Sequence, residues 1–147
     1  MSNKSLFKDS LKIGLEQASI EANNLKEIQS VFEDLSAALE EDIPGVKMSV
    51  ERVRKHEETD IFSGIANLTR RAQPQYMDVV AVSSVANGKY TTIAEWRYSR
   101  LGFPCTIERK DSKTVCQDKE GLENALSSLL QDPAIVKILL SHSTKTE

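Results

Sequence analysis

A repeating apolar pattern along residues 5–41 predicts one long amphipathic helix. Five apolar residues recur at seven-residue spacing on one side of it: Leu11, Ala18, Leu25, Phe32 and Leu39. No proline interrupts this stretch, so a continuous helix would be about 55 Å long, much longer than the three to four turns of an ordinary helix. Asn23-Asn24 is a pair of weak helix formers, which leaves open a helical hairpin packed within one chain.

The pattern changes after Ile43-Pro44-Gly45, which ends the helix. Residues 46–54 alternate, with Val46, Met48 and Val50 on one face, as in a half-buried strand. Residues 55–75 are ambiguous, but Asp60 can cap a short inserted helix that Gln73-Pro74 ends.

Residues 76–100 predict a β-hairpin in which Asn87-Gly88 forms a two-residue type I′ turn. If Ala86 pairs with Lys89, Asp78 lies directly opposite Arg97, a favourable cross-strand pair. The same register places two sets of side chains on the core face: Met77, Val79, Ala81 and Val85 from the first strand, and Tyr90, Ala94, Trp96 and Tyr98 from the second.

The last third of the chain predicts a second hairpin and two short helices. Residues 105–108 and 114–117 pair around a turn, which brings Cys105 and Cys116 close to direct opposition. Asp118 caps a helix at residues 119–130, and Asp132-Pro133 starts the next one. The polar tail 141–147 is expected to fray.

Together these elements predict a single α+β domain over residues 1–147. Its parts are a helical arm at residues 1–42, a sheet at 46–117 and two C-terminal helices at 118–141. The sheet is expected to be antiparallel, to have about five strands with a short inserted helix, and to carry the C-terminal helices on one face.

The composition predicts an acidic cytoplasmic protein that does not insert into a membrane. Of its residues 39% are hydrophobic and 28% charged, as in water-soluble globular proteins, and no apolar run approaches a membrane span. The net charge of −3 is uneven: residues 1–45 carry four Lys against nine acids, whereas residues 46–117 carry twelve Lys and Arg against eight acids.

No residue pattern predicts a catalytic centre, a metal site or a cofactor. The two histidines, His56 and His142, have no recognisable triad or metal-ligand context. The two cysteines are expected to be buried thiols rather than redox groups, and the glycines are isolated rather than grouped in a phosphate-binding loop.

Three function hypotheses follow. The first is a non-catalytic protein-interaction module, homodimeric through the stripe Leu11, Ala18, Leu25, Phe32 and Leu39, because one domain has no internal use for so long an amphipathic helix. Adaptors, chaperones, and inhibitor or immunity proteins belong to this class. The chain is similar to small acidic secretion chaperones in size, charge and element order.

The second hypothesis is a nucleic-acid-binding protein that contacts phosphates through Arg109, Lys110 and Lys113 of the basic middle segment. The third is a ligand binder or small enzyme with a pocket between sheet and helices, lined by His56, Tyr90, Tyr98 or Cys105.

Overall fold

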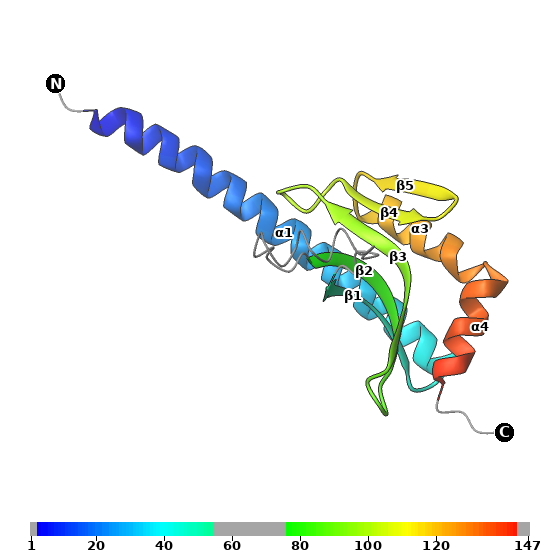
Figure 1. Ribbon diagram of the computed structural model, residues 1–147. Coiled ribbons are helices and arrows are strands. Elements are labelled where there is room, and N and C mark those ends of the chain that lie inside the picture. The colour runs from blue at the N-terminus through cyan, green and yellow to red at the C-terminus, as the bar shows by residue number, and fades with distance from the viewer. Residues whose placement is uncertain (1–2, 55–75, 144–147) are drawn as a thin grey trace, which may run out of the picture.

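The computed structural model describes residues 3–54 and 76–143, and it confirms the predicted α+β fold (Figure 1). The elements, in chain order, are α1 (Lys4–Asp42), β1 (Val46–Arg54), β2 (Tyr76–Ser84), β3 (Tyr90–Tyr98), β4 (Cys105–Arg109), β5 (Ser112–Cys116), α3 (Lys119–Leu130) and α4 (Pro133–His142). The helix predicted within residues 55–75, together with His56, lies outside the described residues, as do the last four residues of the tail.

Helix α1 is one continuous helix of 39 residues, so the alternative of a break at Asn23-Asn24 is wrong. It ends where Ile43 donates its N–H to the carbonyl of Leu39, and Gly45 then turns the chain with a φ of 82°. A positive φ favours glycine, which has no Cβ to clash with the backbone.

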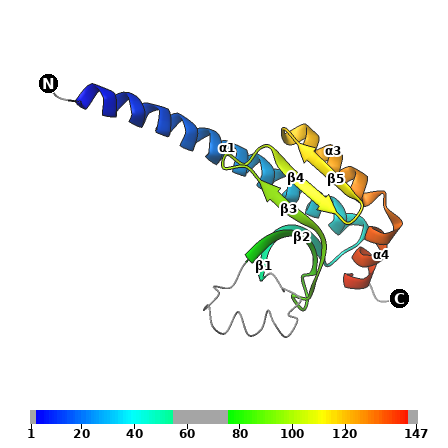
Figure 2. The same cartoon turned by 45° about the horizontal axis from the view of Figure 1, so that its top comes forward.

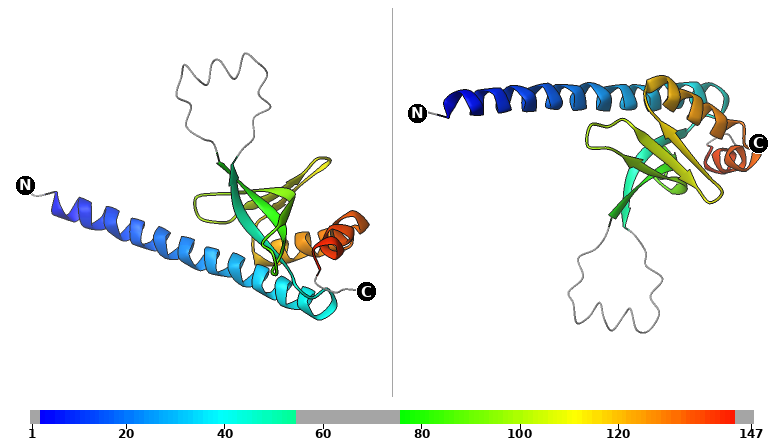
Figure 3. Two further views of the ribbon diagram at one scale, coloured as in Figure 1. Left: turned by 60° about the horizontal axis from the view of Figure 1, so that its bottom comes forward. Right: turned by 90° about the horizontal axis from the view of Figure 1, so that it is seen from above.

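The five strands form an antiparallel meander in the order β1-β2-β3-β4-β5, which leaves β1 and β5 as its edges. The strands curve strongly (Figure 2), and α1, α3 and α4 gather on one side of the sheet (Figure 3). The fold is therefore a sheet with one face covered by helices, and α1 extends far beyond that sheet.

The predicted register of the β2–β3 hairpin is wrong for two reasons. The turn has four residues, Val85–Gly88, so Ser83 pairs with Tyr90. Further along, Ala81 pairs with Thr92 but Val80 pairs with Ala94, which leaves Ile93 as the extra residue of a β-bulge. A shift of one residue exchanges the faces of a strand beyond that point.

The bulge changes which side chains share the core. Val80 and Val82, rather than Val79 and Ala81, join Ala94 and Trp96 in the core cluster, although Val79 and Ala81 are buried as well. Of the three aromatic residues predicted for that core, Trp96 is buried but Tyr90 and Tyr98 are about half exposed.

The predicted Asp78–Arg97 pair is also absent, because the shifted register places Asp78 opposite Trp96. Asp78 instead lies opposite Arg52 of β1, with Arg52 Nε 3.4 Å from its Oδ1. Arg97 approaches two other carboxylates, those of Glu95 and Glu108.

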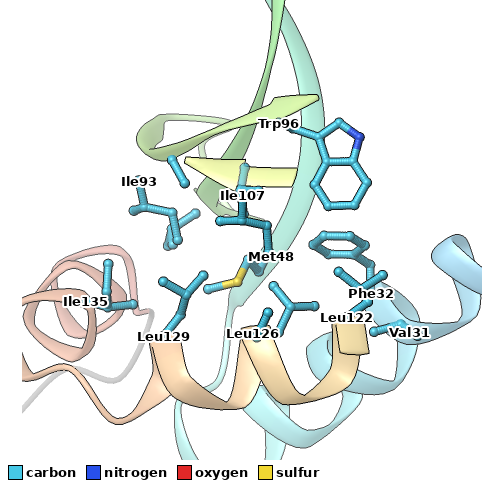
Figure 4. Packing of buried hydrophobic residues seen from close by; sticks show 14 of the residues in the cluster. Val31, Phe32, Met48, Ile93, Trp96, Ile107, Leu122, Leu126, Leu129 and Ile135 are labelled. Atoms are coloured by element: carbon cyan, nitrogen blue, oxygen red, sulfur yellow. The ribbon is translucent and has the colours of Figure 1, made fainter. Parts of the chain in front are cut away.

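The core lies between the sheet and the helices (Figure 4). Leu122, Leu126 and Leu129 of α3 point up toward Met48 and Ile107 of the sheet. Spacings of three and four residues place these leucines on one side of α3, and Asp118 caps its first turn by accepting a hydrogen bond from Gly121 N–H. The two C-terminal helices and their caps are therefore as predicted.

Candidate interaction surface

The first half of α1, N-terminal to Asn24, projects beyond the rest of the protein (Figure 1). The Asn24 side chain donates a hydrogen bond to the Leu101 carbonyl at 2.9 Å, from the loop between β3 and β4. In the same loop a Cβ on Gly102 would lie 3.1 Å from Asn24 Cβ, which shows how closely the two backbones approach. We call Lys4 to Asn23 the arm; at 1.5 Å per residue it is about 30 Å long (Figure 1).

The arm exposes large apolar side chains along two sides. Phe7 and Leu11 are 68% and 63% exposed, on the side that continues toward Leu25. A second set recurs at seven-residue spacing on a different side: Leu6, Ile13 and Ile20. So many exposed large apolar side chains on one helix are typical of a surface that meets another protein.

A groove lies between α1 and the edge strand β1, close to the base of the arm. Its volume is about 490 Å³. Its walls are mostly apolar and comprise Leu25, Ile28, Gln29, Phe32, Glu33 and Ser36 of α1, with Lys47, Met48, Ser49 and Val50 of β1. We call it the α1–β1 groove.

Ser36 occupies part of the edge of β1 that does not pair with β2. Its Oγ lies 3.4 Å from the amide nitrogen and 3.3 Å from the carbonyl oxygen of Met48, so it both accepts and donates a hydrogen bond. These two backbone groups point away from β2, where an added strand would otherwise bind.

Charge is distributed unevenly along α1. Residues 4–12 hold three lysines, Lys4, Lys8 and Lys12, against the single acid Asp9. Residues 27–42 hold six acids and no lysine or arginine. The helix is therefore basic at the tip of the arm and acidic where it packs on the sheet.

The five residues of the predicted stripe do not share one environment. Leu11 and Ala18 are exposed on the arm, and Leu25, 43% exposed, lines the α1–β1 groove. Phe32 and Leu39 are buried in the core, where they hold α1 against the sheet. Three of the five are therefore accessible to another protein.

The residues predicted to contact phosphates lie at the β4–β5 turn. Arg109 Nη1 is 2.7 Å from Asp132 Oδ2, and this hydrogen bond, with one from Ala134 N–H, lowers the pKa of Asp132 below its ordinary value. Lys110 and Lys113 are exposed. Nucleic-acid binding by these three residues stays a prediction.

The other chemically reactive side chains in the described part of the chain lie in separate places. Cys105 and Cys116 face each other on β4 and β5 as free, buried thiols, and burial, with Cys116 as a second cause, raises the pKa of Cys105 to about 12. The His142 ring is hydrogen-bonded to the Thr91 hydroxyl at 2.7 Å. Tyr90 lines a hollow together with residues of β1 and of the β2–β3 turn, whereas Cys105 belongs to the core cluster. Among residues 3–54 and 76–143, no three His, Cys, Asp or Glu side chains are grouped to hold a metal ion.

Two features of this surface were not predicted from the sequence. The stripe of Leu6, Ile13 and Ile20 has the same seven-residue spacing as the stripe that includes Leu11, so the signal for it is present in the sequence. The α1–β1 groove has no such signal, because it depends on which strand forms the sheet edge beside α1.

None of the helices in the described part of the chain is long and apolar enough to cross a membrane. Comparison of the chain with protein-family models, with curated proteins and with solved structures finds no match.

Proposed function

We propose that this protein is a non-catalytic interaction module that forms a homodimer through its arm and serves as an adaptor, a chaperone-like protein or an inhibitor. The observation that carries the proposal is the exposure of apolar side chains on two sides of a helix that has left its own domain. Burial of a large apolar side chain contributes about 1.5–3 kcal/mol, so a surface with this many of them favours association.

The test is the molar mass in solution, measured by size-exclusion chromatography with light scattering over a range of protein concentrations. We expect twice the mass of one chain. The dimer should persist in about 1 M salt, where the screening length is about 3 Å, because its contacts are mainly apolar.

Leu11→Glu should shift the dimer to a monomer, because it places a charge within the buried seam. Ser19→Glu is the matched control: it adds the same charge to the same helix, but Ser19 lies away from both apolar stripes. Equal masses for the two variants, or a monomeric parent protein, would contradict the proposal.

A further inference from the structure

We infer that the surface covering the α1–β1 groove is the arm of a second copy of this chain, lying antiparallel to α1. The inference rests on the proposed dimer and adds to it a partner segment, an orientation and a register. Three observations support it: the continuity of the apolar stripe into the groove, the charge along α1, and the hydrogen bonds that close the strand edge.

The groove continues the apolar side of the arm. Leu25 belongs to the seven-residue stripe of Leu11 and Ala18 and also forms part of the groove wall. Phe32, seven residues further on, lines the groove as well. A helix that covers the exposed stripe of the arm therefore runs directly into the groove without changing direction.

Charge selects the antiparallel orientation. With two copies antiparallel in the register given below, the tip at residues 4–12 faces residues 24–32 of its partner, where Lys26 and Glu27 balance, and Lys4 lies next to Glu33 and Asp34. With two copies parallel, basic tip would meet basic tip and acidic half would meet acidic half. Complementary charges favour the first arrangement and like charges disfavour the second.

Two-fold symmetry requires every facing pair of residue numbers to have the same sum, and we infer the register in which the apolar Leu11 and Leu25 pair. If Leu11 faces the Leu25 position of the other copy, Leu25 must face Leu11 in return, and Ala18 faces its own counterpart at the axis. The small Ala18 side chain permits the 8–10 Å approach of packed helices. In the same register Phe7 lies over Gln29, which lines the groove.

The strand edge favours a helix over an extended peptide as the occupant. A peptide that extended the sheet beside β1 would need the N–H and carbonyl of Met48, and Ser36 already bonds to both. A helix satisfies its own backbone and needs only the apolar walls of the groove.

The test is disulfide cross-linking of the full chain carrying Phe7→Cys together with Gln29→Cys. Both positions are exposed, so the substitutions leave the core intact. Within one copy they are 22 residues apart on one helix, about 33 Å, far beyond the reach of a disulfide. Any bond between them joins two chains.

Mild oxidation should give a covalent, reducible dimer. Asp9→Cys with Gln29→Cys is the matched control. Asp9 lies only two residues from Phe7 along the helix, but its side chain points away from the apolar stripe. Close apposition raises the effective thiol concentration of the Phe7–Gln29 pair to about the millimolar range, so we expect roughly tenfold less dimer from the control. The parent protein should give none, because its two cysteines are buried.

The remaining outcomes separate this inference from the proposed function. If light scattering shows a dimer but the Phe7–Gln29 pair cross-links no better than its control, the arm does not lie in the groove and only the inference fails. Efficient cross-linking of Phe7→Cys alone would indicate parallel arms and would also overturn it. A monomeric protein would overturn both proposals and leave the groove to a different partner.

Discussion

The ring of Phe32 on α1 meets the indole of Trp96 on β3 edge to face, with centroids 5.6 Å apart and planes inclined by 73°. This contact joins the longest helix to the centre of the sheet, and an edge-to-face pair adds about 0.5–1.5 kcal/mol to the burial of its rings. Phe32 has the same heptad position as Leu11, yet only Phe32 lies in the core.

Phe32→Ala should therefore lower the free energy of unfolding by about 3–5 kcal/mol, because it leaves a cavity beneath Trp96. Leu11→Ala, in the same stripe, should change it by less than about 0.5 kcal/mol in dilute, monomeric protein. Urea unfolding followed by Trp96 fluorescence measures both. Similar losses for the two variants would show that the arm packs on its own domain.

Gly102→Ala should destabilise the docking of the β3–β4 loop against α1. Gly102 has a φ of 94°, and an added Cβ would lie 3.1 Å from Asn24 Cβ. The unfavourable φ alone is expected to cost about 1–3 kcal/mol. Thermal unfolding gives the loss, with Gly88→Ala as the control, because Gly88 shares a positive φ of 70° but has open space around it. The excess loss at Gly102 reports the contact with α1, and no excess would contradict it.

The Arg109–Asp132 pair should make stability depend on acid pH. Its hydrogen bond lowers the pKa of Asp132 in the folded protein, so the unfolded chain takes up this proton first as the pH falls. The stabilisation is complete above the ordinary value of 3.8 and is lost as the pH falls below it.

Asp132→Asn keeps an oxygen to cap α4 but cannot titrate, so its unfolding free energy should decline less steeply below pH 3.8 than that of the parent protein. Urea titrations from neutral pH down through 3.8 give this difference. Parallel curves for the two proteins would show that the pair contributes nothing.

The facing thiols of Cys105 and Cys116 should be unreactive in the folded protein. Burial raises the pKa of both, that of Cys105 to about 12, so neither forms appreciable thiolate at neutral pH. A thiol reagent should label both only at the rate of unfolding, and labelling should become immediate in denaturant. Rapid labelling of the native protein would show that the β4–β5 hairpin opens locally.

Sequence reasoning was most successful where the cause of structure is local. The apolar repeat located α1, and Asp118 and Asp132-Pro133 located the starts of α3 and α4, because caps and helical periodicity act within a few residues. The alternation of Val46 and Met48 correctly placed both in the core.

It failed where a distant contact decides the outcome. Thr92, Ile93 and Ala94 give no local sign that Ile93 is the extra residue of a bulge, since only the packing of both halves of the hairpin requires it. The point at which α1 leaves the domain is set by its contact with the loop at Leu101 and Gly102. Leu101, which accepts the hydrogen bond from Asn24, lies 77 positions away from it in the sequence. Within the candidate surface, the stripe could be identified from the sequence but the groove could not.

The separation of the arm from its own domain also determines how the arm folds. A helix of about 20 residues gains little stability from its backbone alone, and in proteins most helical stability comes from tertiary contacts. Residues 4–23 are therefore expected to exchange between helix and coil in the free protein, and a molecule that covers them should shift this exchange toward helix. If the arm binds a second molecule as proposed, binding would be coupled to folding: its affinity would include the helix–coil free energy, and an arm mutation far from any contact would weaken binding through helical propensity alone.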